Sequence, residues 1–186
     1  MNDGTFELMK NIKEGKYWEK VLDRHFRNRY DIHEVPLHVD KAGVDRIWTD
    51  KQQEELPIAV QYKSDSEVEY YNNAFIEVDV RHYNSNGEIS PSWPFTSKAE
   101  IHCHFFPPFQ VVCLVNMMHL KSLIPTFSRY DLSGWVPSSN DGKTWFNRGR
   151  KIPVDIFYRE FCFDVQEVEF TEEDVRHLEA QRKQIS

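Results

Sequence analysis

Two short, mostly apolar stretches decide the fold of this chain: Gly43-Val44-Asp45-Arg46-Ile47-Trp48 and Ile58-Ala59-Val60-Gln61-Tyr62-Lys63. Each has the length and apolar character of a β-strand, and the polar residues between them predict a hairpin. Side chains on a strand alternate between its two faces, so Gln61 and Lys63 point to one face and Tyr62 to the other. The hairpin therefore brings Asp45 together with Gln61 and Lys63 at the edge of a sheet.

This predicted edge combines three kinds of polar group. Asp45 supplies a carboxylate, Gln61 an amide oxygen and Lys63 an ammonium group. Oxygen ligands of this kind suit a divalent metal, and a metal with a positioned water hydrolyses phosphodiesters. The set therefore indicates metal-dependent phosphodiester hydrolysis.

The same pattern resembles the core motif of the PD-(D/E)XK nuclease superfamily. Gly-x-Asp at 43–45, a spacer, and Gln-x-Lys at 61–63 carry the resemblance, which extends over roughly residues 14 to 125. It implies an α/β (α+β) fold with a restriction-endonuclease-like core, in which helices flank a central mixed sheet of four to five strands. The function that it implies is that of a nuclease acting on DNA.

The resemblance also implies roles for individual residues. Asp45 would bind Mg²⁺ or Mn²⁺, and the Gln61 side-chain oxygen and the Tyr62 carbonyl would add neutral ligands. Lys63 would orient the attacking water and stabilise negative charge on the phosphate. Most members carry Glu or Asp where this chain has Gln61, so the negative charge at the metal is lower unless an acid on the first helix, Glu14, takes part.

Residues 5–29 predict the first helix, because apolar side chains recur there every three or four residues. Glu14 falls on the apolar face, one turn before Trp18, and a carboxylate on a buried face needs a partner. One interpretation is that Glu14 reaches the metal beside Asp45. The other is that it lies at the solvent end of the helix or pairs with a lysine. Glu19, at the edge of the same face, is the alternative acid.

Histidines and cysteines form a second candidate site. His102, Cys103 and His104 are consecutive, and Cys113 and His119 follow them. Zinc binds these residue types, but their spacing matches no usual zinc pattern. Core cysteines, with histidines at the surface or at the edge of the core, are the interpretation that we favour.

Residues 74–83 alternate between polar and apolar side chains, which predicts a half-buried strand. Glu77 and Asp79 lie on its polar face and have the chemistry of a further metal-binding pair. The favoured interpretation is two carboxylates on a solvated face, balanced by a neighbouring cation such as Arg81.

Residues 128–153 predict a loop-rich segment, because Ser, Gly, Asn and Pro are frequent there. The segment also interleaves basic with aromatic residues, which suits contact with phosphates and stacking on bases. The alternative is a solvated loop with its aromatic side chains packed beneath it. The candidate nucleic-acid-binding residues are Lys143, Trp145, Arg148, Arg150 and Lys151.

The remaining elements follow from local patterns. Ser97 is a candidate N-cap for a helix, although a strand would also fit the residues after it. Thr171 is a candidate N-cap for a closing charged helix, with Asp174 at the third helical position. The expected elements are a helix at Ala99–Phe106, a strand at Phe109–Asn116, a helix at Met118–Phe127 and a strand at Val154–Val168.

The composition limits the function classes. The chain of 186 residues is expected to be one domain, with a nuclease-like core at about 5–127 and an extension at 128–186. Gly-rich phosphate loops are absent from the sequence, and a net charge of -7 does not favour broad nucleic-acid binding. Three scattered cysteines and the lack of a long apolar run predict a cytoplasmic protein without a membrane partner.

Three hypotheses remain open from the sequence. The first is a metal-dependent DNA nuclease, with a homodimer as a possible assembly. The second is an inactive nuclease-like fold that binds nucleic acid or protein. The third is a plain αβ domain in which Asp45 and Lys63 form an ordinary salt bridge.

Overall fold

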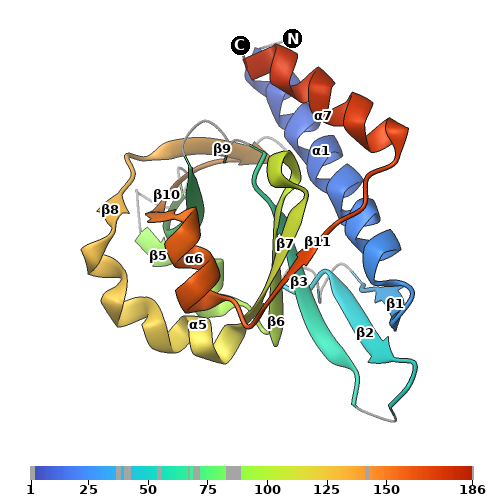
Figure 1. The fold of residues 1–186 in the computed structure, drawn as a ribbon. Helices are drawn as coiled ribbons and strands as arrows, with labels where there is room; N and C mark the ends of the chain where they lie inside the picture. Colours follow the sequence, from blue (N-terminus) through green and yellow to red (C-terminus); the bar gives the residue numbers. More distant parts are fainter. Residues whose placement is uncertain are drawn as a thin grey trace.

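The structure, a computed structural model, describes residues 3–36, 39, 43–53, 56–66, 68, 72–82, 89–140 and 143–185 of the chain (Figure 1). Of residues 3–13, 79–82, 124, 136–140, 143–145 and 184–185 only the backbone is described. The helices and strands follow one another in this order: α1 (Asp3–Phe26), β1 (Tyr30–Glu34), β2 (Arg46–Asp50), β3 (Ile58–Ser64), β4 (Asn73–His82), β5 (Ile89–Pro91), α4 (Trp93–Thr96), β6 (Ile101–Phe106), η1 (Pro107–Phe109), β7 (Val111–Asn116), α5 (Met117–Leu123), η2 (Ile124–Arg129), β8 (Asp131–Leu132), β9 (Val136–Asn140), β10 (Lys143–Pro153), α6 (Val154–Phe161), β11 (Asp164–Glu167) and α7 (Glu172–Ile185).

The first sheet is mixed and, within the described residues, contains six strands in the order β1-β2-β3-β6-β7-β11. The predicted hairpin is the antiparallel pair of β2 and β3 in this sheet. On its other side, β3 pairs in parallel with β6. The other neighbouring strands are antiparallel. The fold is therefore α+β, as expected, but the sheet is wider than four to five strands because β6 and β11 both join it.

Each face of the first sheet is covered by a separate buried cluster. α1 and α7 lie side by side over one face (Figure 1), where Trp18, Trp48 and Phe105 are buried together. The other face packs against the second sheet and α6, with Phe106 and Phe157 in its core. Since apolar burial is the main favourable term in folding, these two clusters fix α1 and the second sheet on opposite sides of the first sheet.

The prediction of a helix at Ala99–Phe106 is wrong, because Ile101–Phe106 forms strand β6 between β3 and β7. Cys103 and Phe105 face the α1 cluster, while His104 packs on Phe106 and Phe157 on the other side. A strand that is buried on both faces has no exposed polar side by which its sequence could be recognised.

The prediction of a loop-rich segment at 128–153 is also wrong. Its strand β10 pairs with β4, β8 and β9 in the second sheet, whose main path is β5-β4-β10-β8. Gly149 stands at a register shift in β10, where an added Cβ would lie 2.6 Å from the Ile76 carbonyl oxygen. Gly149 therefore allows β10 to pack closely against β4, and this contact cannot be recognised from the local sequence because β4 is distant in the chain.

The predicted strand at Val154–Val168 divides into helix α6 and strand β11. Val154, Phe157 and Phe161 are buried on one side of α6, at helical spacing. The closing helix is confirmed. Thr171 and Asp174 bond reciprocally at its start, with Thr171 N donating to Asp174 Oδ2 at 2.7 Å and Asp174 N donating to Thr171 Oγ1 at 3.3 Å.

Within the described residues, none of the helices combines the length and the apolar character that a membrane span requires.

Candidate functional site

Asp45 lies beside the middle of β3, as the hairpin predicts. Its backbone N–H donates to the Val60 carbonyl at 2.8 Å, and its carboxylate oxygen Oδ2 accepts from the Tyr62 backbone N–H at 2.6 Å. The carboxylate is therefore held at the edge of the sheet by the strand that also carries Gln61 and Lys63.

Gly43 sets the conformation of the backbone just before Asp45 and β2. Its φ is +74°, in the left-handed region, and an added Cβ would lie 2.8 Å from Ser97 Oγ. Ser97 Oγ donates to the Gly43 carbonyl at 2.7 Å. Both observations favour glycine here, so the Gly-x-Asp pattern has a local structural cause.

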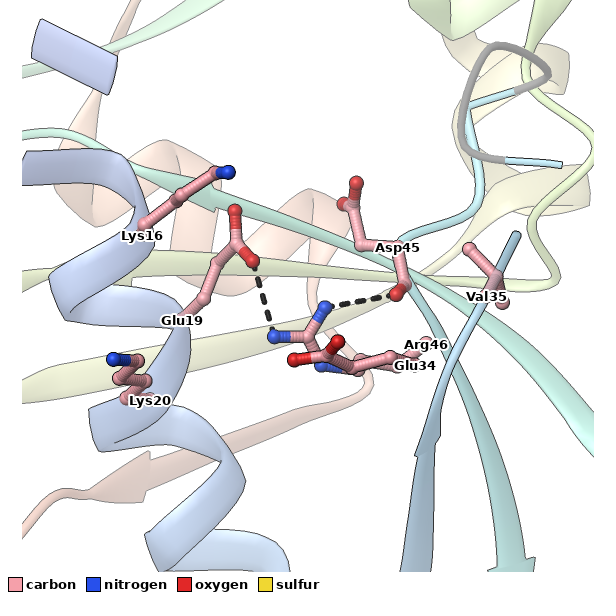
Figure 2. Close-up of a pocket in the computed structure, with 7 residues that line it drawn as sticks. All are labelled: Lys16, Glu19, Lys20, Glu34, Val35, Asp45 and Arg46. Carbon is pink, nitrogen blue, oxygen red and sulfur yellow. Dashed lines mark hydrogen bonds and ion pairs between the residues drawn. The ribbon is translucent and has the colours of Figure 1, made fainter. Parts of the chain in front are cut away.

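A cavity of about 300 Å³ opens between α1 and the start of β2. Figure 2 shows the carboxylates of Glu19 and Asp45 and the ammonium of Lys16 pointing toward the same space. The cavity is lined by Lys16, Glu19, Lys20, Glu34, Val35, Asp45 and Arg46. Two acids that are distant in the sequence thus face one opening.

Glu19, rather than Glu14, is the acid of α1 that lines this cavity. Glu19 also borders an adjoining cavity of about 130 Å³, together with Tyr62 and Lys63. Glu14 lies toward α7, where its charge raises the pKa of His177 against a larger lowering by burial. The structure therefore brings Asp45, Glu19 and Lys63 to two neighbouring cavities and leaves Glu14 outside their linings.

Arg46 connects the acids of α1 to the strand edge. Its Nε donates to both carboxylate oxygens of Asp23 at 3.1 Å, and its Nη2 donates to Glu19 Oε2 at 3.1 Å. Its Nη1 donates to the Asp45 carbonyl at 2.9 Å. Burial raises the pKa of Glu19, and the attraction of Arg46 opposes that rise.

The Lys63 ammonium is directed toward the second sheet. Its Nζ lies 3.0 Å from Glu77 Oε1, and Ser92 Oγ donates to Glu77 Oε2 at 3.1 Å. Burial acts to raise the pKa of Glu77, but Lys63 and Ser92 outweigh it and the pKa is lowered. The partner of Glu77 among the described side chains is therefore Lys63 on β3, whereas the side chains of Asp79 and Arg81 lie outside the described part.

The half-buried Gln61 and the two buried histidines of β6 lie next to Lys63. In the β3–β6 register Gln61 is opposite His102 and Lys63 is opposite His104. His102 Nε2 and His104 Nδ1 are 3.2 Å apart, so one ring donates to the other. Among the described residues, Gln61 Oε1, His102 Nδ1 and Trp93 Nε1 are buried atoms without a hydrogen-bond partner.

Burial lowers the pKa of both histidines. For His102 the nearby His104 and Lys63 lower it further, to well below the ordinary value. For His104 the carboxylate of Asp65, 3.9 Å from Nε2, opposes the effect of burial. The two rings are therefore neutral members of the core. The core position of Cys103 is as predicted, but the expectation of histidines at the surface or core edge is wrong for His102 and His104, because β6 is covered on both faces.

The candidate basic residues Lys143, Arg148, Arg150 and Lys151 lie on β10. Arg148 stacks over the Trp135 ring at 4.8 Å, Arg150 Nη1 donates to the Tyr130 carbonyl at 2.9 Å, and Lys151 is exposed. The side chains of Lys143 and Trp145 lie outside the described part. Strand β9, the partner of β10 in its hairpin, contacts α1, so this hairpin reaches the helix that carries Glu19.

The cavity fits a magnesium ion by its donor chemistry. Mg²⁺ is commonly held by one or two carboxylates, with water and phosphate oxygens as its other ligands. Glu19 and Asp45 supply two such carboxylates at one opening. No group of three or more His, Cys, Asp or Glu side chains in the described part of the chain is placed to hold a metal by itself. The site therefore suits a metal that shares its ligands with substrate.

Four charged residues of the cavity were missed by the sequence analysis: Lys16, Lys20, Glu34 and Arg46. A signal for the lysines was present, because residues four apart share one face of a helix. Lys16 and Lys20 follow this spacing on α1, as do Glu19 and Asp23. Arg46 follows Asp45 directly, but nothing in the sequence pairs it with acids of α1.

Comparison of the chain with family models, with curated proteins and with solved structures finds no match. The resemblance to the PD-(D/E)XK nucleases therefore stays a prediction from the sequence.

Proposed function

We propose that this protein is a metal-dependent phosphodiester hydrolase that acts on DNA, with its site in the cavity between α1 and the start of β2. One observation carries the proposal. Glu19 and Asp45, from separate elements, face the same cavity, and Glu19 also borders the neighbouring cavity that Lys63 lines.

Each residue has a separate role in this proposal. Asp45 and Glu19 hold Mg²⁺ or Mn²⁺, which when bound activates a water molecule and neutralises phosphate charge. Lys16 and Lys20 contact phosphate oxygens at the cavity rim. The Lys63 ammonium pairs with Glu77 on the side of the second sheet, so Lys16, which points into the cavity, stabilises the negative charge that develops during hydrolysis. Gln61 keeps its side chain neutral, so the site depends on Glu19 for its second negative charge.

A second candidate function is nucleic-acid binding without hydrolysis. It is favoured by the ion pairs that already engage two of these groups, Glu19 with Arg46 and Lys63 with Glu77. The basic strand β10, whose hairpin partner contacts α1, would then supply part of the binding surface.

A cleavage assay separates the two functions. Plasmid, linear double-stranded DNA, single-stranded DNA and RNA are incubated with the protein and Mg²⁺ or Mn²⁺. Asp45→Asn and Glu19→Gln keep the size of each side chain and remove its charge, so we expect each to lower the cleavage rate by about a hundredfold or more. Glu14→Gln is the matched control on the same helix and should cleave at the wild-type rate.

Two results would count against hydrolysis. In the first, the wild type cleaves none of these substrates with either metal. In the second, Asp45→Asn and Glu19→Gln cleave as fast as the wild type. Tight binding of DNA by a wild type that does not cleave would support the second function instead.

A further inference from the structure

Arg46 connects the two acids of the cavity to each other. Its guanidinium contacts the Glu19 carboxylate and the backbone carbonyl of Asp45 (Figure 2). We infer that Arg46 is a positioning residue of this site, which fixes Glu19 relative to Asp45, and that Asp23 holds Arg46 in place. The inference rests on the proposed function, because it concerns the same two carboxylates.

The contacts of Arg46 leave its guanidinium little freedom. All three of its nitrogens donate, Nε to Asp23, Nη2 to Glu19 and Nη1 to the Asp45 carbonyl, at distances between 2.9 and 3.1 Å. The residue is 7% exposed, and its guanidinium lies 5.5 Å from the centre of the Tyr62 ring. A buried, fully engaged side chain of this kind sets the distance between the elements that it joins.

Lysine cannot replace these contacts. The planar guanidinium presents its donors in a fixed fork, whereas an ammonium is a point charge on a flexible stem. One ammonium group cannot contact Asp23, Glu19 and the Asp45 carbonyl in the geometry of the guanidinium. Glu19 then loses its fixed orientation toward the cavity.

Asp23 matters because of charge. Arg46 carries one positive charge, and the bidentate contact with Asp23 balances it. The charges of Glu19 and Asp45 then remain available to a divalent cation. Without Asp23, the guanidinium would compete with that cation for Glu19.

The test measures Mn²⁺ binding to the full chain by titration calorimetry, without DNA. Outer residues that orient metal ligands usually change metal affinity by 10- to 100-fold. We expect Arg46→Lys and Asp23→Asn each to bind Mn²⁺ about tenfold more weakly than the wild type. Arg29→Lys is the matched control, because Arg29 pairs with Asp50 and does not line the cavity. It should bind Mn²⁺ as the wild type does.

The outcomes separate this inference from the proposed function. If Mn²⁺ does not bind, or if Asp45→Asn and Glu19→Gln bind it as the wild type does, the proposed metal site is wrong. If those two variants lose Mn²⁺ while Arg46→Lys and Asp23→Asn keep wild-type affinity, the site stands and the positioning role is overturned. Thermal unfolding without metal completes the test, because a variant that lowers the melting temperature alone shows a purely structural role.

Discussion

On the α1 face of the first sheet, charged side chains pair beside an open cavity, whereas on the face toward the second sheet they pair in the space between the two sheets. Arg46, Glu19 and Asp23 form the first group, and the two acids are 30% and 15% exposed. Lys63 and Glu77 belong to the second group, with the buried ring of His104 next to Lys63. The same sheet therefore carries one polar cluster beside a cavity and one between two sheets, where the side chains of Lys63 and Glu77 are 23% and 21% exposed.

The difference teaches where function and stability are to be sought. A polar group at an open cavity can exchange a protein partner for a ligand at little cost, because water reaches both states. A polar group between two sheets cannot replace its protein partner in this way, because the loss of that partner leaves it without a hydrogen-bonding group or water. Lys63 stands at the boundary, since it lines the smaller cavity and its ammonium pairs with Glu77.

The largest expected effect comes from breaking the enclosed pair. Glu77→Leu leaves the Lys63 ammonium without its carboxylate. Because the pair is half-buried, the loss of unfolding free energy should lie between that of a surface and that of a buried pair, at about 2 kcal/mol. Urea denaturation measures this loss. The double variant Lys63→Met/Glu77→Leu should recover most of it, because two apolar side chains of similar size need no partner.

An exposed pair provides the control for this measurement. Arg176 and Glu172 lie one turn apart on α7, and both are strongly exposed. Arg176→Ala should lower the unfolding free energy by only about 0.5 kcal/mol or less. If Glu77→Leu costs no more than this control, water reaches the face toward the second sheet as readily as the α1 face, and the difference between the two faces is refuted.

The next effect concerns pH. Burial lowers the pKa of His102 and His104 in the folded protein, so the unfolded chain takes up protons first as the pH falls below about 6.5. Stability is therefore complete above that pH and is lost on acidification. Between pH 7 and 5.5 the two histidines should together remove about 2 kcal/mol of unfolding free energy. Denaturation at a series of pH values measures the slope.

His104→Gln separates this effect from simple packing. At pH 8, where the rings are neutral in both states, the difference from wild type reports the cost of the substitution alone. Below pH 6.5 the variant should lose stability less steeply than the wild type. Some slope should remain, because burial also lowers the pKa of His177 on α7. A slope equal to that of the wild type would show that His104 takes up its proton equally easily in the folded protein.

The local sequence pattern was enough to predict the helices and strands that have one apolar face and one polar face. Residues 46–50 and 58–64 form the expected hairpin, and α1 follows its apolar stripe. The strand at Ile101–Phe106 was missed because both of its faces are buried, with two histidines on one of them. Strand β10 was missed because its conformation is set by pairing with β4, far away in the sequence.

The candidate site was predictable to the same limited extent. The hairpin places Asp45 beside β3, which sequence spacing indicated. The choice between Glu14 and Glu19 depends on how α1 is rotated on the sheet, and that rotation is set by the packing of Trp18 and its neighbours. The pairing of Lys63 with Glu77 depends on how the two sheets face each other, which the sequence of neither strand specifies.

The smallest expected effect concerns the open cluster. Arg46→Met leaves the carboxylates of Glu19 and Asp23 without their cation, but Glu19 lines a cavity that admits water and Asp23 is 15% exposed. The loss of this cation should cost more than the loss of a surface pair and less than the loss of a buried pair, at about 1 kcal/mol of unfolding free energy. Urea denaturation under the conditions used for Glu77→Leu allows the two faces to be compared directly.

Salt provides the internal check on this last prediction. Charges that water reaches are screened by added salt, whereas an enclosed pair is screened much less. The loss caused by Arg46→Met should therefore shrink when sodium chloride is raised from low to molar concentration, while the loss caused by Glu77→Leu should change little. If Arg46→Met instead costs as much as Glu77→Leu and its cost does not depend on salt, the carboxylates of Glu19 and Asp23 are shielded from solvent and are not available to a ligand.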